Sequence, residues 1–368
     1  MLSKAISMEF LNYSVFDGYS LSDNQDVIIA DSNVNRIGPT NSQHINADII
    51  IPGFIDLQIY GSGGRLFSAD PSVENLCHIE NDLLRKGTTG FLACIATNTS
   101  KVFHRCIEVA KTHRAVAKNC LGLHLEGPFL NPKRRGAHVE EFIRKASLEE
   151  VKRLIDFGDG IIKMITIAPE LQDDDIIQYL LDQDIVVSLG HSDASFEQAT
   201  RAYNNGIQTT THLFNAMSPL QHRAPGVAGA VFNHPKAKAS IIVDGLHVDF
   251  EMVRISHKLM GERLFLITDA VTECNVGPYQ HRLSGDKFVM PDGTLSGSSL
   301  TMLQAVKNCV IHCGISLTDA LKMSTSIPAG LLGMQSGKGK LKVGGEADFL
   351  IIDSDFNLKK VIYNGVEV

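Results

Sequence analysis

The fold is decided by residues 161–212, which read IIKMITIAPELQDDDIIQYLLDQDIVVSLGHSDASFEQATRAYNNGIQTTTH. Short apolar runs predict strands, and the amphipathic segments between them predict helices. The predicted strands are Ile162–Ala168, Ile185–Gly190 and Gln208–His212, and the predicted helices are Asp173–Gln183 and Ser195–Asn204. Strands that are nearly continuous runs of apolar residues are typical of a parallel sheet buried on both faces. This stretch therefore predicts the repeated strand–helix units of an α/β protein.

The same alternation extends to both sides of this stretch. Further strands are predicted at Ile50–Ile59, Thr89–Ile95, Cys120–Glu126, Ala239–Val243 and Leu264–Thr268. Further helices are predicted at Ser72–Lys86, Ser147–Phe157, Phe250–Met260, Ser299–Cys313 and Leu317–Leu332. Eight such strands in sequence favour a closed (β/α)8 barrel of the TIM type. A doubly wound open sheet is the alternative, and the lack of a convincing GxGxxG motif after a first strand counts against it.

The two ends of the chain have a different pattern. Short runs of alternating apolar and polar residues, broken by Asp, Asn and Gly, are typical of antiparallel strands. Asn364-Gly365 predicts the turn of a hairpin. Because chain ends often lie close together, we expect a small β-sandwich domain built from residues 1–50 and 335–368. Residues 51–334 would form the catalytic barrel.

Composition and charge restrict the class of protein. The chain has 368 residues, 44% hydrophobic and 20% charged, as in ordinary globular proteins. Its net charge of −7 argues against a nucleic-acid partner but not against a phosphorylated substrate. Seven cysteines without a CxxC pair favour reduced thiols in a cytoplasmic protein. We find no apolar leader and no run of about 18 apolar residues, so we expect no signal peptide and no membrane segment.

Polar residues recur where the predicted strands end, which is where barrel enzymes form their active sites. Glu126, His191, His212 and Asp269 close or follow four of the strands, and His247 follows a fifth. Any one of them alone fits a surface residue or a helix cap better than a metal ligand. Their recurrence at one rim favours a shared site, because two imidazoles and one carboxylate are a usual ligand set for a catalytic zinc.

Most other histidines have no such support. His124 lies two residues before Glu126 on the same strand face and is expected in the barrel core. Eight more fall in predicted helices or loops and are expected to be solvated, namely His44, His78, His104, His113, His234, His257, His281 and His312. The basic loop Lys133-Arg134-Arg135 fits equally well a lid that steers an anion inward or a solvated turn.

A set of motifs in a fixed order carries a family resemblance. In sequence they are PGFIDLQIYG, HLEGPFLNPKRRGAH, GHSDAS, THLFNAM, PGVAGAV, DGLHVD, LITDAV and LSGSSLTM. With the return strand GEADFLIID they cover nearly the whole chain, which resembles the N-acetylglucosamine-6-phosphate deacetylase family of the amidohydrolase superfamily. The most specific of them is HLEGPF followed by RGAH. The resemblance implies a barrel, a small β-sandwich from both chain ends, and a homodimer.

The resemblance also implies roles for single residues. Glu126, His191 and His212 would bind one divalent metal ion, with Zn²⁺ favoured and Fe, Co or Mn possible. Asp269 would act as general base and acid on a metal-activated water. The substrate would be contacted by Ala137, His138, Asn215, Ala216, Arg223, His247, Leu295, Ser296 and Gly297. The implied reaction removes acetate from N-acetyl-D-glucosamine 6-phosphate to give glucosamine 6-phosphate, in amino-sugar catabolism.

One departure and three alternatives remain. Many amidohydrolases carry His-x-His after the first strand and bind a second metal with it, whereas this chain has Gln58-Ile59-Tyr60, which favours one metal. N-acetylgalactosamine 6-phosphate is an alternative or additional substrate. A reaction on a cyclic amide usually needs two metals, so the missing histidine pair counts against it. A metal-binding scaffold without catalysis is a further alternative, and the presence of Asp269 counts against it.

Overall fold

The central sheet forms a closed parallel barrel. The computed structural model describes residues 7–43, 46–334 and 337–368, so the prediction for His44 and parts of both predicted terminal segments lie outside it. Within these residues one sheet has eight parallel strands in the order β14-β13-β12-β11-β10-β9-β8-β5. They are β5 (Phe54–Ile59), β8 (Thr88–Ala96), β9 (Cys120–Glu126), β10 (Ile162–Ile167), β11 (Val186–Leu189), β12 (Thr209–Thr210), β13 (Lys238–Ile241) and β14 (Leu264–Leu266).

Hydrogen bonds between the first and last strands close this sheet. The backbone N–H of Asp269 donates to the carbonyl of Gln58 at 3.0 Å, and that of Tyr60 donates to Ala270 at 2.9 Å. Both bonds join the end of β5 to the segment after β14, which confirms the predicted barrel. Buried polar side chains hydrogen-bonded across the strands, namely His124, Thr166, Thr211 and Ser188, occupy the inside, so the barrel is a packed core rather than a pore.

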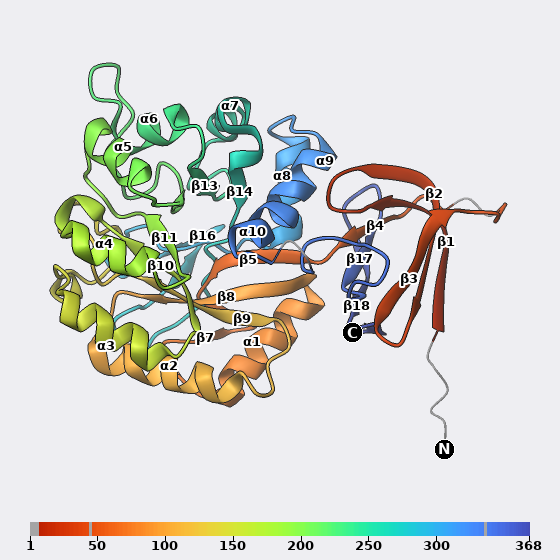
Figure 1. Cartoon of the computed structure of the whole chain (residues 1–368), viewed down its shortest axis with the longest axis horizontal. Coiled ribbons are helices and arrows are strands. Elements are labelled where there is room, and N and C mark those ends of the chain that lie inside the picture. The colour runs from red at the N-terminus through yellow and green to blue at the C-terminus, as the bar shows by residue number, and fades with distance from the viewer. Residues whose placement is uncertain (1–6, 44–45, 335–336) are drawn as a thin grey trace.

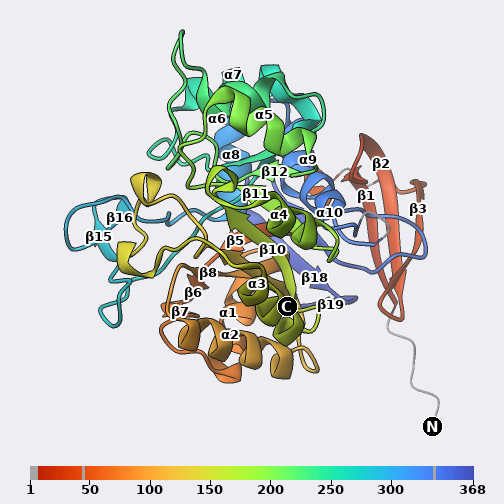
Figure 2. The ribbon, with the colours of Figure 1, turned by 60° about the vertical axis from the view of Figure 1, so that its left-hand side comes forward.

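Helices cover the outside of the barrel (Figures 1 and 2). They are α1 (Val73–Arg85), α2 (Ser100–His113), α3 (Leu148–Gly158), α4 (Asp174–Leu181), α5 (Phe196–Asn204), α6 (Gly226–Asn233), α7 (Phe250–Met260), α8 (Met302–Ile311), α9 (Leu317–Ser324) and α10 (Ser326–Leu331). Ser72, Ser147 and Ser195 cap α1, α3 and α5 by accepting a backbone N–H three residues on. None of the described helices is long and apolar enough to cross a membrane.

Two predicted elements are each divided in the structure. The helix Leu317–Leu332 is two helices, α9 and α10, because Pro328 cannot donate a backbone hydrogen bond and fits only the first turn of a new helix. The strand Ile50–Ile59 is likewise β4 (Ile49–Pro52) followed by β5, and only β5 belongs to the barrel. At the junction a Cβ on Gly53 would lie 2.0 Å from the Thr89 hydroxyl oxygen, so the chain can cross there only with glycine.

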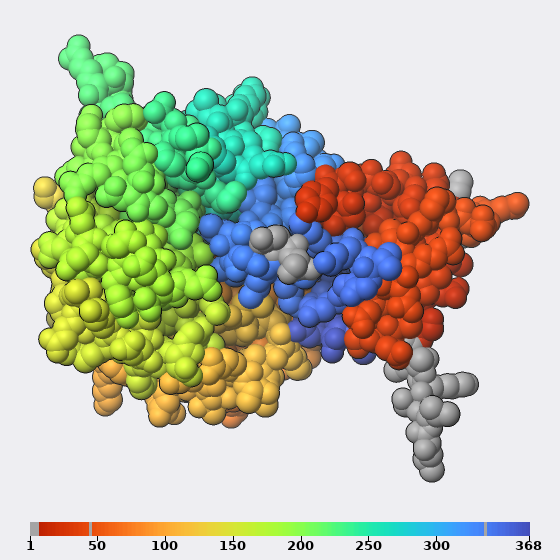
Figure 3. All heavy atoms as spheres, in the orientation of Figure 1, coloured from red at the N-terminus to blue at the C-terminus, as the bar shows by residue number. Residues whose placement is uncertain are grey.

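The two chain ends form a separate mixed sheet. Its strands β1 (Ser7–Phe16), β2 (Leu21–Ala30), β3 (Asn33–Pro39), β4, β17 (Phe349–Ile352), β18 (Leu358–Tyr363) and β19 (Val366–Glu367) lie in the order β19-β18-β17-β4-β1-β2-β3. The red N-terminal and blue C-terminal segments meet at one end of the molecule (Figures 1 and 3). The predicted association of the ends is confirmed, whereas the division into domains at residues 51 and 335 stays a prediction.

This sheet has an apolar core of its own. Within this core the rings of Phe10 and Phe349 pack edge to face, with their centroids 5.1 Å apart. Asn364 and Gly365 have φ values of 50° and 74° and connect β18 to β19, as predicted from the Asn-Gly pair.

His113 corrects one prediction about the histidines. It is buried, with its Nε2 2.9 Å from Glu80 Oε2, whereas we expected it to be solvated. The other oxygen of Glu80 accepts the backbone N–H groups of Lys118, Asn119 and Cys120. Cys77 lies close enough to complete a three-ligand group, but the Glu80 carboxylate is already fully hydrogen-bonded. This cluster therefore anchors the segment before β9 to α1 and α2.

Candidate active site

The predicted metal ligands and Asp269 meet at the carboxyl ends of the barrel strands. Glu126 is the last residue of β9, and His191, His212 and Asp269 follow β11, β12 and β14 within three residues. His191, His212 and Asp269 have positive φ values of 47°, 33° and 54°. Left-handed backbone is uncommon outside glycine, and its recurrence just after three of the barrel strands turns these side chains toward one point. All four side chains are buried and face one cavity.

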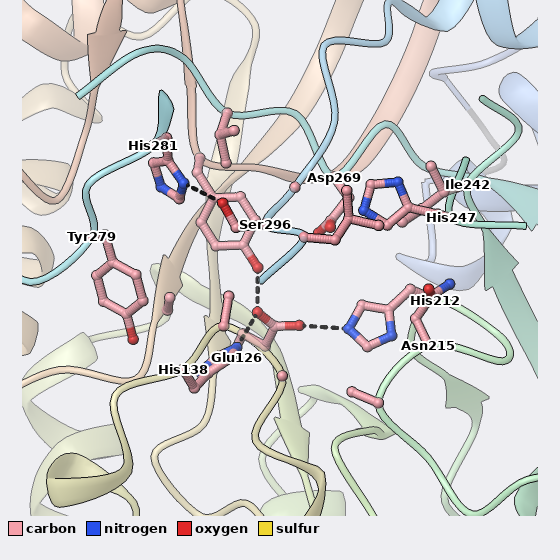
Figure 4. A pocket seen from close by; sticks show the side chains of 18 of the residues that line it. Glu126, His138, His212, Asn215, Ile242, His247, Asp269, Tyr279, His281 and Ser296 are labelled. Atoms are coloured by element: carbon pink, nitrogen blue, oxygen red, sulfur yellow. Dashed lines mark hydrogen bonds and ion pairs between the residues drawn. The ribbon is translucent and has the colours of Figure 1, made fainter. Parts of the chain in front are cut away.

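Three side chains converge on a single point. Glu126 Oε1 lies 3.2 Å from His191 Nε2 and 3.0 Å from His212 Nε2, and the two nitrogens are 3.1 Å apart. Figure 4 shows Glu126 at the centre of this group, with His212 and His138 directed toward it. Two imidazole nitrogens cannot both donate to each other and to one carboxylate oxygen, so lone pairs face one another. A cation at their centre would satisfy all three, and the donor set fits a divalent metal.

The surroundings of His191 orient it as a ligand. Its Nδ1 lies 2.9 Å from the carbonyl of Arg134, which can only accept, so the proton is on Nδ1 and Nε2 keeps its lone pair. The guanidinium of Arg134 bonds Asp193 at 2.8 Å. The basic loop Lys133-Arg134-Arg135 is therefore held in place by the ion pair of Arg134, and the Arg134 carbonyl orients the predicted metal ligand His191.

The neighbouring imidazoles favour the ionised form of Glu126. Burial raises the pKa of this carboxyl, but the nearby rings of His138 and His191 outweigh burial and hold the pKa well below its usual range. Asp269 differs from Glu126 in this respect. Burial first, and then the negative charge of Glu126, raise the pKa of Asp269 well above its usual range. The two carboxyls thus have opposite preferences, which is typical of a site that needs one ligand and one proton carrier.

The predicted substrate residues fall into two groups. Ala137, His138, Asn215, Ala216, His247, Leu295, Ser296 and Gly297 all line the cavity. His138 accepts the backbone N–H of Thr97 at Nδ1, 3.3 Å away, and its Nε2 lies 2.9 Å from Glu126 Oε2. His247 Nδ1 lies 2.6 Å from Asp244 Oδ2. Arg223, by contrast, is exposed and does not line the cavity of the single chain.

Several residues of the cavity were not predicted from the sequence. His281 was expected to be solvated, but it is buried and its Nδ1 lies 2.8 Å from the Ser296 hydroxyl (Figure 4). Burial lowers its pKa to about 4. Tyr60, Leu66 and Tyr279 form much of the apolar wall. Only Tyr60 carried a signal in the sequence, because it stands where related enzymes have a metal ligand. His124 is buried in the barrel, as predicted.

Asp56 should give the folded protein a pH-dependent stability. It is fully buried on β5 and accepts the Thr268 hydroxyl and the backbone N–H of Gln58. Burial raises its pKa from 3.8 to about 6. Between these two values the folded state holds a proton that the unfolded state has lost. Asp56 therefore makes the free energy of unfolding fall as the pH rises from about 4 to about 6.

Asp56→Asn removes this titration. Relative to the parent protein, the variant should gain up to about 3 kcal/mol in unfolding free energy between about pH 4 and about pH 7. Urea unfolding of both proteins across this range measures the difference. A difference that stays constant with pH would show that Asp56 is ionised throughout.

The chain is similar to known proteins along nearly its whole length. Residues 49–368 match the model of the amidohydrolase family. The chain is 34% identical over 324 residues to N-acetylglucosamine-6-phosphate deacetylase of Haemophilus influenzae, which covers 85% of this chain and 84% of that protein.

Solved structures of similar proteins share the fold. The N-acetylglucosamine-6-phosphate deacetylase of Pasteurella multocida superimposes with a TM-score of 0.92 at 33% identity, over 99% of this chain and 100% of that one. An aspartate-to-alanine variant of the Mycobacterium smegmatis enzyme, in complex with N-acetyl-D-glucosamine-6-phosphate, superimposes with a TM-score of 0.89 at 30% identity, over 98% and 99% of the two chains.

Proposed function

The chain belongs to the amidohydrolase family and, within it, to the N-acetylglucosamine-6-phosphate deacetylases, and from this premise we propose that it hydrolyses N-acetyl-D-glucosamine 6-phosphate to acetate and glucosamine 6-phosphate. One observation carries the chemistry. Glu126, His191 and His212 place three ligand atoms within 3.2 Å of one another, and Asp269 lines the same cavity.

A single divalent cation would be held by Glu126 Oε1 and the Nε2 atoms of His191 and His212. When bound, such a cation polarises an amide carbonyl and lowers the pKa of water to about 7. Zn²⁺ suits two imidazoles and a carboxylate, although Fe, Co or Mn can occupy the same ligands. Gln58 and Tyr60 offer no strong ligand for a second ion, so we propose one metal per chain.

Asp269 would carry the proton. It accepts a proton from the attacking water and delivers it to the amide nitrogen, so that the C–N bond breaks with a neutral amine leaving. Gln58 Nε2 bonds one oxygen of this carboxyl at 2.7 Å and so fixes its orientation. His138 would border the carbonyl. Its Nδ1 accepts from Thr97, so the neutral ring carries its proton on Nε2 and donates it to Glu126 Oε2.

The sugar phosphate would occupy the outer part of the cavity, whose volume is about 790 Å³ with its mouth included. Asn215, Ala216 and His247 supply polar groups on one side, and residues 295–297 close the other. Arg223 precedes α6, where Figures 1 and 3 show a loop that protrudes from the barrel. Its guanidinium must approach the cavity, from the same chain or from another copy, before it can bind phosphate.

Arg223→Ala tests the phosphate role. Loss of a bidentate contact should raise KM for the phosphorylated sugar about tenfold or more, because a charge-assisted hydrogen bond contributes roughly 1.5–3 kcal/mol. KM for unphosphorylated N-acetylglucosamine should stay the same. Arg254→Ala, which removes an exposed arginine on α7, is the matched control and should change neither value. Equal increases for both substrates would exclude phosphate binding by Arg223.

Acetate release separates the candidate functions. We expect release from N-acetylglucosamine 6-phosphate, and its rate with the galacto epimer decides between single and dual specificity. Release from neither epimer, together with turnover of a cyclic amide, would favour the alternative amidohydrolase reaction. Bound metal without any turnover would leave a scaffold. We further propose that the protein is cytoplasmic, which its seven unpaired cysteines support. We also propose a homodimer, which the family resemblance implies.

A further inference from the structure

We propose that Tyr60 is a positioning residue that occupies the second oxygen of Glu126 and thereby restricts this carboxylate to one metal-binding atom. The inference rests on the proposed function, because it assumes that Glu126 binds a cation. It assigns a task to a side chain that stands where related enzymes carry a histidine ligand.

The two oxygens of Glu126 have different partners. Oε1 faces His191, His212 and Gln58 Nε2, at 3.2, 3.0 and 2.9 Å. Oε2 accepts the hydroxyl of Tyr60 and lies 2.9 Å from His138 Nε2. A carboxylate oxygen offers about two lone-pair directions. Tyr60 and His138 therefore use up Oε2, whereas both metal-binding imidazoles lie on the side of Oε1.

The direction of the Tyr60 hydrogen bond is fixed by its partner. The side chain of Glu126 is a carboxylate, which only accepts, so the phenol proton goes to Glu126 Oε2. Gln58 Nε2 has two hydrogens, which its two shortest contacts use, at 2.7 Å to Asp269 Oδ1 and at 2.9 Å to Glu126 Oε1. Gln58 also joins the catalytic carboxyl to the metal-binding carboxylate, so Asp269 and Glu126 keep a fixed separation.

The backbone and the apolar wall hold Tyr60 in place. Its N–H donates to Ala270 at 2.9 Å, and its carbonyl accepts from Phe67 at 3.0 Å. Its ring packs on the apolar cluster that contains Leu66, Ala96 and Tyr279. The phenol is thus anchored independently of any ion, and the carboxylate is oriented before a cation arrives. Partners of this kind commonly change metal affinity 10- to 100-fold.

Tyr60→Phe removes only the hydroxyl and keeps the ring in its apolar contacts. Glu126 Oε2 then loses one of its two hydrogen-bond donors. The carboxylate is no longer oriented before the cation arrives, and Oε2 becomes available to the cation. We expect Kd for zinc, measured by chelator competition, to rise about 10- to 100-fold. We also expect the visible spectrum of the Co²⁺-loaded protein to change, because a second carboxylate oxygen alters the coordination. A purely structural hydroxyl would leave that spectrum the same.

Tyr279→Phe is the matched control. Tyr279 lines the same cavity, but its hydroxyl donates to the carbonyl of Thr97 and contacts no predicted ligand. This variant should keep the zinc affinity and the cobalt spectrum of the parent protein. If Tyr60→Phe also keeps both, the inference is wrong while the proposed function stands. If the parent protein binds no metal at all, the proposed function fails first.

Discussion

Asp269→Asn should keep its metal and lose about three to four orders of magnitude in kcat. The amide of asparagine has nearly the shape of the carboxyl and can accept hydrogen bonds, but it cannot take up a proton at neutral pH. The attacking water would then lose its base and the departing amine its acid. KM should change little, because the binding groups of the cavity remain.

The measurement is kcat for acetate release together with zinc content in the same preparation. Asp286→Asn, which neutralises an exposed carboxylate on the loop between β15 (Arg282–Ser284) and β16 (Lys287–Val289), serves as control and should retain full turnover. Near-normal kcat in a zinc-loaded Asp269→Asn protein would remove Asp269 from the role of proton carrier.

His212→Ala should lose both the metal and the activity. A site that needs two imidazoles and one carboxylate has too few ligands once an imidazole is removed. Zinc content should fall from one ion per chain to nearly none, and acetate release to background. Because bound metal stabilises only the folded state, added zinc should raise the Tm of the parent protein but not the Tm of His212→Ala.

His247→Ala is the appropriate comparison for this variant. His247 lies at the same rim and lines the same cavity, but it is hydrogen-bonded to Asp244 rather than to Glu126. Its removal should leave one zinc per chain, whatever it does to substrate binding. Stoichiometric zinc in His212→Ala would place the metal elsewhere.

The sequence was most informative where local pattern and tertiary position coincide. Runs of Ile, Val and Leu predicted the barrel strands, because a strand that is buried on both faces has apolar residues on both faces and no alternating polar residues. Glu126, His191 and His212 could then be placed at one rim, since parallel strands have their carboxyl ends on the same side. These placements needed no knowledge of side-chain contacts.

The failures concern residues whose environment depends on distant segments. Buried His113 is hydrogen-bonded to Glu80 on another helix, and buried His281 to Ser296 on a later loop. The division between β4 and β5 depends on contact between Gly53 and Thr89. Each requires three-dimensional proximity that periodicity does not encode.

The most direct test of the account is a zinc titration of metal-free protein, with bound zinc and acetate release measured on the same samples. Release from N-acetylglucosamine 6-phosphate should increase in proportion to bound zinc and reach its maximum at one ion per chain. Full activity without metal, or activity that continues to rise until two ions are bound, would contradict a site built on Glu126, His191 and His212.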